Sequence, residues 1–186
     1  TSVWDNVHIH HGAQIGEQCI VGEKSYIAYD VVIGNRVKIN AMVYICAAVT
    51  IEDGVMISAG TIFTNDRFPR ATFPDLKTLR PSEPDEHTLK TLVREGATIG
   101  AGCTIGNDLT IGRWAMVGMG SLVTKSVPDF HLVIGSPARS IGAVCKCGQL
   151  FHKFSVEDAE EFEAKCSVCN LEYEINKLKV SEKRLS

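Results

Sequence analysis

The sequence predicts an all-β fold whose main body is a parallel β-helix of hexapeptide repeats. Three observations support this prediction. An aliphatic residue returns at every sixth position, a residue able to stack inward precedes it by two, and one phase is kept through residues 1–63 and again through residues 91–123. A period of six matches neither the 3.6-residue period of a helix nor the alternation of a single strand. It is typical of a hexapeptide β-helix.

The repeat is clearest in residues 91–123. Its aliphatic position holds Val93, Ile99, Ile105, Ile111, Val117 and Val123, and a glycine follows four of these residues. Residues 1–63 show the same phase from Val3 to Phe63. Three hexads make one coil of about 18 residues, and the coils should stack about 4.8 Å apart. The alternative is a set of ordinary short strands, which the constant phase argues against.

Residues 64–92 interrupt this pattern and are predicted to form a loop extruded from the β-helix. They include four prolines, which cannot join a regular ladder: Pro69, Pro74, Pro81 and Pro84. A long excursion from a compact domain is usually functional or disordered. The loop begins with Asn65, Asp66, Arg67 and Arg70, and arginine suits phosphate or carboxylate ligands. A merely solvated loop is the alternative.

The remaining sequence divides the chain into two domains. Pro128 ends the repeat, and residues 127–143 are predicted to form a strap over the last coil, which an open β-helix end requires. We therefore expect a β-helix domain over residues 1–143 and a small domain over residues 144–186.

Four cysteines in the second domain predict a metal site. Cys145 and Cys147 form one close pair, and Cys166 and Cys169 form another. Two such pairs are typical of a four-thiolate zinc site in a zinc-ribbon-like domain. Because four thiolates leave no open coordination position, this zinc is expected to be structural. Two disulfides are the competing interpretation, and an intracellular setting argues against them.

Composition narrows the range of partners. The net charge is −3 and no dense basic run is present, which disfavours a nucleic-acid partner. The sequence has no apolar stretch of twenty residues and no signal peptide, so no membrane partner and a cytoplasmic location are expected.

The sequence resembles the left-handed parallel β-helix acyltransferases. Among these it is similar to the nucleotide-amino-sugar N-acetyltransferases that act on 3-amino sugars, including the UDP-2-acetamido-3-amino-2,3-dideoxyglucuronate type. The resemblance covers roughly residues 1–143, and its matching segments are SVWDNVHI (2–9), FTNDRFPRA (63–71), TLVREGATIGAGCTIG (91–106), IGRWAMVGMGSLVTKSVPD (111–129) and GSPARSIG (135–142). It implies a left-handed helix, a homotrimer, acetyl-CoA bound in the groove between subunits, a nucleotide-linked amino sugar as acceptor, and a role in polysaccharide biosynthesis.

The resemblance also implies roles for individual residues. Backbone and small-residue surfaces at Ala101, Gly118 and Met119 would contact the pantetheine of acetyl-CoA, and Lys125 and Arg139 would meet its phosphates. Asn65 would lie near the reacting amine. His8 matches the histidine of the family's VHI segment, and we expect the acceptor to contact it together with Asn40, Arg67 and Arg70.

The residues at the start of the loop favour an amine acceptor. This corner offers Asn65 and Asp66 and no histidine. We expect Asp66 to orient the amine and accept its proton, and Asn65 to hold the amine or the tetrahedral oxyanion; His87 is a weaker candidate base. The alternatives are O-acetyl transfer to a sugar, a non-catalytic assembly module, and a γ-type carbonic anhydrase, which needs three metal-binding histidines.

Overall fold

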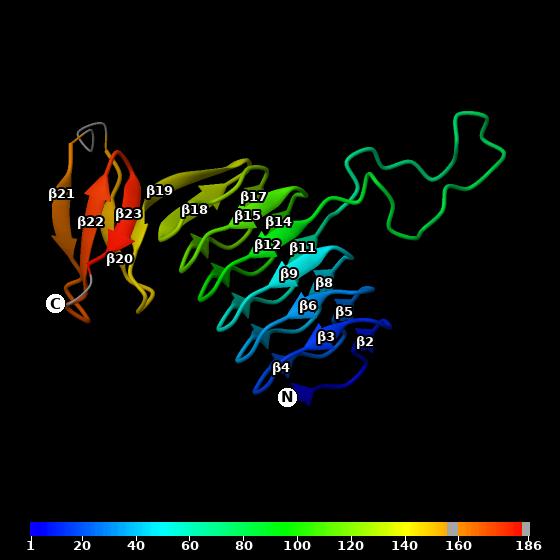
Figure 1. Ribbon diagram of the computed structural model, residues 1–186, viewed down its shortest axis with the longest axis horizontal. Coiled ribbons are helices and arrows are strands. Elements are labelled where there is room, and N and C mark those ends of the chain that lie inside the picture. The colour runs from blue at the N-terminus through cyan, green and yellow to red at the C-terminus, as the bar shows by residue number, and fades with distance from the viewer. Residues whose placement is uncertain (156–159, 184–186) are drawn as a thin grey trace.

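The body of the protein is a left-handed parallel β-helix of about seven coils, seen in a computed structural model that describes residues 1–155 and 160–183 (Figure 1). Residues 156–159 and 184–186 of the predicted C-terminal domain lie outside the described residues. Most strands of the coils have two or three residues, and each pairs in parallel with the equivalent strand of the next coil. The β-helix therefore has three sheets, one for each side of a prism. No helix in the described ranges has the length and apolarity that crossing a bilayer requires.

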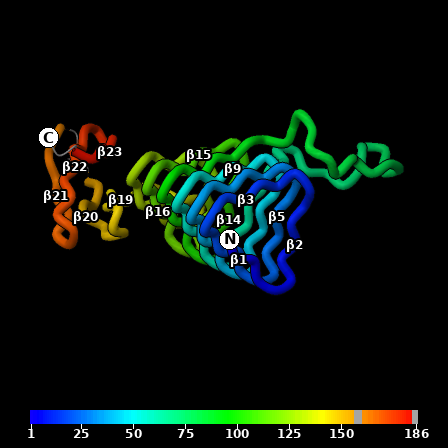
Figure 2. The backbone as a smooth tube through the Cα atoms, turned by 60° about the horizontal axis from the view of Figure 1, so that its bottom comes forward, coloured from blue at the N-terminus to red at the C-terminus, as the bar shows by residue number. Residues whose placement is uncertain are grey.

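The sheets follow the order of the coils, as the end-on view in Figure 2 shows. The first contains β1 (Ser2–Val3), β4 (Ile20–Val21), β7 (Lys38–Ile39), β10 (Met56–Ile57), β13 (Thr98–Ile99) and β16 (Met116–Val117), and then continues into β18 to β20. The second contains β2 (His8–Ile9), β5 (Tyr26–Ile27), β8 (Tyr44–Ile45), β11 (Ile62–Phe63), β14 (Thr104–Ile105) and β17 (Leu122–Val123). The third contains β3 (Gln14–Ile15), β6 (Val32–Ile33), β9 (Val49–Ile51), β12 (Thr91–Val93) and β15 (Leu109–Ile111).

The strand register locates the loop. Paired residues lie 18 apart in the first coils, as Ser2 and Ile20 do, and 42 apart across the loop, as Met56 and Thr98 do. The difference of 24 residues is the length of chain added between β11 and β12, and this segment extends away from the prism (Figure 1). Two isolated antiparallel bridges occur within it, Asp66 with Thr88 and Thr72 with Leu79.

The core is a set of aliphatic columns inside the prism. Ile27, Ile45, Ile57, Ile99 and Ile105 are all 0% exposed. From Cys19 onward the predicted inward stacking positions are buried too, including polar Ser25 and Thr61, whose hydroxyls donate to backbone carbonyls. This burial follows from the hexad, because each coil places the same two positions against the coil below.

The glycines that follow the aliphatic residue of a hexad are required by the close packing of successive coils. A positive φ recurs every six residues around the corners, mostly at non-glycine positions such as Asp30 and Arg36. The glycine that follows the aliphatic residue is needed for close approach instead: a Cβ on Gly100 would lie 2.5 Å from the Met119 nitrogen. Glycine thus permits tight stacking of successive coils there.

The C-terminal end turns the first sheet around. β18 (His131–Gly135) is parallel to β16, whereas β19 (Ala138–Val144) and β20 (Leu150–Lys153) are antiparallel additions. A separate sheet holds β21 (Phe162–Lys165), β22 (Glu172–Asn176) and β23 (Lys179–Glu182). β19 runs through the predicted domain boundary at residue 143. A second core, which includes Phe130, Ala143 and Tyr173, joins the strap to the C-terminal strands.

Candidate active site

The start of the loop is fixed to the coil beneath it by hydrogen bonds. The Asn65 side-chain nitrogen donates to the Ala47 carbonyl at 3.2 Å, and the Leu89 backbone nitrogen donates to the Asn65 carbonyl at 2.9 Å. Because a carbonyl only accepts, the Ala47 contact defines which end of the Asn65 amide is the nitrogen. The Asn65 side-chain oxygen therefore remains an acceptor for a ligand, which suits an amine better than an oxyanion.

Asp66 is held beside Asn65 in a turn. Its Oδ1 accepts from the Phe68 backbone nitrogen at 2.7 Å, an arrangement common for Asp at the start of a turn. The Asn107 side chain donates to the Asp66 backbone carbonyl at 3.0 Å. Both Asn65 and Asp66 are half-buried. The two predicted catalytic residues are thus ordered by the coil below, the coil above and the loop's own backbone.

A cavity of about 550 Å³ lies between these residues and the second sheet. The predicted residues Asn65, Asp66 and Arg70 line it. The loop contributes further lining residues that include Arg80, Asp85 and Thr88, while the coils contribute Tyr26, Ala28, Tyr29, Tyr44, Cys46 and Ala47. The cavity therefore combines aromatic, cationic and carboxylate groups around the site predicted for the chemistry.

The other residues predicted to contact the acceptor lie outside this lining. His8 is one coil removed and contacts Tyr26, with ring centroids 5.2 Å apart. Asn40 follows β7 at another corner, where its carbonyl accepts from Ser25. Arg67 forms an exposed ion pair with Asp108 at 3.1 Å. A role for these three residues in acceptor binding stays a prediction.

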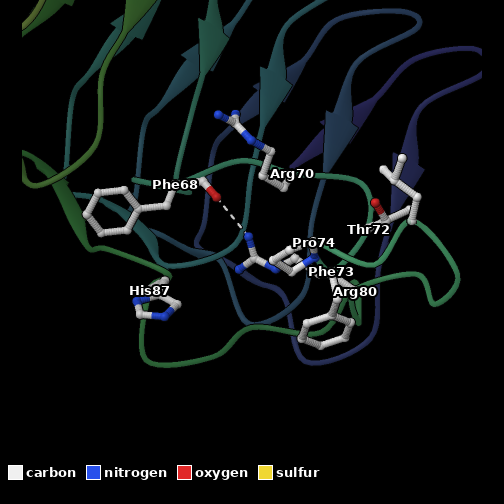
Figure 3. Close-up of a pocket in the computed structure, with 8 residues that line it drawn as sticks. Phe68, Arg70, Thr72, Phe73, Pro74, Arg80 and His87 are labelled. Atoms are coloured by element: carbon white, nitrogen blue, oxygen red, sulfur yellow. Dashed lines mark hydrogen bonds between the residues drawn. The ribbon is translucent and has the colours of Figure 1, made fainter.

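A second cavity, of about 560 Å³, belongs to the loop itself (Figure 3). His87 and Phe68 meet on one side with ring centroids 5.9 Å apart, and Arg80 donates to the Phe68 carbonyl at 2.7 Å. His87 lines this cavity and not the one that contains Asn65 and Asp66. This placement makes His87 a poor candidate for the base.

Sequence reasoning missed the aromatic wall of the main cavity. Tyr26 and Tyr44 occupy the same outward position of hexads 18 residues apart, and this spacing is visible in the sequence. The Tyr26 hydroxyl is 2.6 Å from Nε2 of His10, whose pKa is lowered by partial burial and by His8 and His11. Reading the outward positions with the same period as the inward ones would have identified this wall.

The predicted phosphate-binding residues lie further along the same corner of the prism. Phe63 pairs with Ile105, and Ile105 pairs with Val123, so Asn65, Asn107 and Lys125 follow at equivalent places. Lys125 and Arg139 line a common cavity of about 170 Å³. At about 4.8 Å per coil, Lys125 stands roughly 10 Å beyond Asn65.

The residues predicted to contact pantetheine lie at a different corner, after β13 and β16. The Gly120 nitrogen donates to the Ala101 carbonyl at 2.8 Å, and the Gly118 nitrogen donates to the Val133 carbonyl at 2.8 Å. Met119 is 82% exposed. Within one chain the second sheet separates this corner from Lys125.

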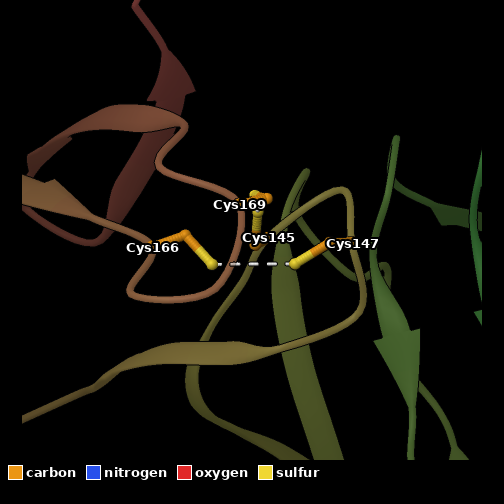
Figure 4. A group of neighbouring side chains, drawn as sticks. All are labelled: Cys145, Cys147, Cys166 and Cys169. Atoms are coloured by element: carbon orange, nitrogen blue, oxygen red, sulfur yellow. Dashed lines mark hydrogen bonds between the residues drawn. The ribbon is translucent and has the colours of Figure 1, made fainter.

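The four cysteines come together as the spacing predicts (Figure 4). Their sulfur atoms all lie within 4.8 Å of one another, with Cys145 3.2 Å from Cys169 and Cys147 3.6 Å from Cys166. A tetrahedral zinc with Zn–S bonds of about 2.3 Å requires sulfur separations of roughly 3.8 Å. The donor set therefore fits a metal held between two turns.

The surroundings of the thiols also fit a metal. Backbone N–H groups of Cys169 and Val168 lower the pKa of Cys166 to about 6, which favours its thiolate. Burial raises the pKa of Cys145 to about 12, and a bound cation would oppose that shift. The Tyr173 hydroxyl donates to the Cys145 sulfur at 3.1 Å, the kind of outer contact that orients a ligand.

Known structures share this architecture. The acetyltransferase domain of PglB from Neisseria gonorrhoeae aligns over 74% of this chain and 57% of its own length, with a TM-score of 0.59 and 20% identity. A hexapeptide-repeat acetyltransferase from Vibrio cholerae, solved with acetyl coenzyme A, aligns over 71% of this chain and 70% of its own, with a TM-score of 0.57 and 25% identity. The chain has the fold of the hexapeptide-repeat acetyltransferases.

A curated enzyme is similar to part of the sequence. Over 58 residues, 31% of this chain, the sequence is 45% identical to the dTDP-3-amino-3,6-dideoxy-alpha-D-galactopyranose 3-N-acetyltransferase of Aneurinibacillus thermoaerophilus. The match spans 30% of that enzyme's length. No family model matches the chain.

Proposed function

We propose that the protein is an acetyl-CoA-dependent N-acetyltransferase that acts on the amino group of a nucleotide-linked amino sugar. One observation supports this most strongly. The cavity at Asn65 and Asp66 and the cationic pair Lys125 and Arg139 follow one corner of the prism. The acceptor then enters from the N-terminal side of Asn65 and acetyl-CoA from the C-terminal side. The V. cholerae complex and the sequence relative are consistent with these two substrates.

An amine acceptor suits a site without a strong base. A sugar amine with a pKa near 8 is about one-tenth neutral at pH 7, so deprotonating it costs roughly 1.4 kcal/mol. A hydroxyl with a pKa near that of water would cost about 12 kcal/mol by the same arithmetic. Positioning of the amine by Asn65 and Asp66 is then sufficient for the reaction, because holding the amine and the thioester in the geometry for attack lowers the activation barrier greatly.

Each bond and proton in the acetyl transfer can be assigned to the two substrates, Asn65 and Asp66. The neutral amine nitrogen forms a bond to the thioester carbonyl carbon, with the Asn65 side-chain oxygen accepting one N–H and the Asp66 carboxylate aligning the other. Collapse of the tetrahedral intermediate breaks the carbon–sulfur bond. Asp66 takes the amine proton, and the departing CoA thiolate finally receives it. The products are the amide and CoA.

The direct test is thiol release from acetyl-CoA in the presence of dTDP- and UDP-linked 3-amino sugars. Release with an amino sugar and none with the matching 3-hydroxy sugar is expected. Release with the hydroxy sugar alone would favour O-acetyl transfer. Absence of both acetyl-CoA binding and turnover would favour a non-catalytic assembly module, and carbon dioxide hydration would indicate a carbonic anhydrase.

The separation of the two CoA-contacting corners supports a homotrimer. Ala101 and Met119 stand at one corner and Lys125 at another, so a groove between two prisms would bring one corner from each chain to a single acetyl-CoA. We expect light scattering to give three times the chain mass at micromolar concentration. A stable monomer that still turns over would contradict this shared groove.

The cysteine cluster is proposed to hold one structural zinc through Cys145, Cys147, Cys166 and Cys169. Protein prepared without chelator should contain about one zinc per chain, and Cys166→Ala should lose it together with the near-ultraviolet signal of buried Tyr173. Cys103→Ala is the matched control, since this thiol is buried in the β-helix core. Two disulfides by mass spectrometry would contradict the proposal.

A further inference from the structure

A column of stacked rings covers the outer face of the second sheet on its first three coils. His8, Tyr26 and Tyr44 are register partners on β2, β5 and β8. The His8 and Tyr26 rings are 5.2 Å apart at 10°, and the Tyr26 and Tyr44 rings are 4.9 Å apart at 12°. The stacking follows directly from the coil spacing, which places equivalent side chains about 4.8 Å apart.

The column ends at Tyr44. The next register position is Ile62 on β11, an aliphatic side chain shorter than a tyrosine ring. Tyr44 is 43% exposed and Ile62 is 46% exposed. Among the residues that the structure describes, the Tyr44 ring stacks on Tyr26, and its other side is toward Ile62 in place of a further ring.

Tyr44 borders the proposed active-site cavity. Tyr26, Tyr29 and Tyr44 form its wall on the prism side, and Asn65 lies on the adjoining coil. Ala47, whose carbonyl accepts from Asn65, is three residues beyond Tyr44, a chain length of at most about 10 Å. A ligand with a flat ring on Tyr44 can thus extend a linker toward Asn65.

We propose that Tyr44 is the stacking platform for the nucleobase of the acceptor, with the base continuing the column His8–Tyr26–Tyr44. Aromatic side chains bind bases in this way without requiring a particular base. The loop places Arg70 and Arg80 in the same cavity, where guanidinium groups suit a diphosphate. The inference rests on the proposed function and identifies where the nucleotide part of its acceptor binds.

Two sources of a base are present in the proposed reaction, the acceptor nucleotide and the adenine of CoA. Lys125 and Arg139 draw the phosphates of CoA to the coils beyond Asn65, whereas Tyr44 lies on the opposite side of Asn65. The base on Tyr44 should therefore come from the acceptor. Titrations with dTDP and with CoA separate the two sources.

The test is calorimetric titration of dTDP into the full chain and its variants. Tyr44→Leu should weaken dTDP binding about 5- to 150-fold, the range expected for loss of one base–aromatic stack. Tyr44→Gln should do the same, and Tyr44→Phe should stay within about twofold because the ring remains. CoA affinity should be unchanged in all three. Ile20→Ala, an exposed strand position on the first sheet, is the matched control.

Three outcomes would overturn the inference. Tyr44→Leu could leave the dTDP affinity unchanged, weaken CoA binding instead, or alter the oligomeric state without changing dTDP affinity, which would assign the column to subunit packing. The thiol-release assay keeps this result separate from the proposed function. Acetyl transfer to amino sugars with binding of neither dTDP nor UDP by the wild type would overturn the platform alone, whereas nucleotide binding that depends on Tyr44, with no acetyl transfer, would overturn the function alone.

Discussion

The β-helix wall and the extruded loop differ in regularity and in burial. The wall repeats one hexad, and its inward residues such as Ile51 and Ile105 are almost completely buried. The loop has four prolines and two isolated bridges, and large apolar side chains on it, Leu76 and Leu79, are 81% and 73% exposed. Stability therefore resides in the wall, while the candidate chemistry lies at the junction of the two.

Removing the loop should have the largest effect on turnover while leaving the β-helix folded. Deleting residues 66–89 removes 24 residues, the length that the register assigns to the insertion. We expect the circular dichroism spectrum and CoA affinity to persist, because the hexad phase is preserved. Turnover should fall below about one-hundredth of the wild-type value, because Asp66 and the loop side of the cavity are lost. Loss of the β-helix spectrum would show that the loop also supports the wall.

A single change inside the wall should act on stability instead. Ile51→Ala empties part of a core column and should lower the free energy of unfolding by about 2–5 kcal/mol. Thr50→Ala, the outward neighbour on β9, is the control and should stay within about 0.5 kcal/mol. Denaturant titration of both variants measures the difference. Equal effects at the two positions would contradict the alternation of buried and exposed residues along β9.

Single changes at the junction should affect turnover without unfolding the wall. Asn65→Ala and Asp66→Ala should each reduce turnover about a hundredfold, corresponding to roughly 3 kcal/mol. The Kd for CoA should not change, because the proposed phosphate contacts are Lys125 and Arg139. Turnover of the wild type should rise with pH toward the acceptor amine's pKa near 8.

His87→Ala is the control at this junction. It should lower turnover only slightly, because His87 lines the other cavity. Abolished turnover in His87→Ala together with normal turnover in Asp66→Ala would instead make the loop histidine the base. Direct attack by a nearly neutral amine would then no longer explain the site.

The sequence was most informative where one rule repeats. The period of six predicts the buried columns, and the paired cysteines predict the cluster at the C-terminal strands. The break in the period also places Asn65 and Asp66 at the start of the loop, while their catalytic role stays a prediction. These predictions succeed because each depends on local spacing.

Other features depend on how the irregular loop folds. Nothing in the order of Arg67 and Arg70 indicates that the first pairs with Asp108 while the second lines the cavity. Cys46 is buried, yet it borders the same cavity. The approach of Arg80 and Asp85 to the coils depends on contacts between distant segments, which short-range patterns do not encode.

The reversal of direction at β19 has a consequence for how copies of the chain can associate. A parallel β-helix exposes, at its last coil, strand edges to which an identical coil of another molecule could add, and repeated addition would produce a filament. β19 pairs antiparallel with β18 on the edge that a further coil would occupy, and it ends next to Cys145 of the cysteine cluster; β20 in turn pairs antiparallel with β19. A second prism arriving end to end cannot pair with β18, because β19 already occupies that edge. The antiparallel strand β19 thus prevents end-to-end polymerisation along the helix axis.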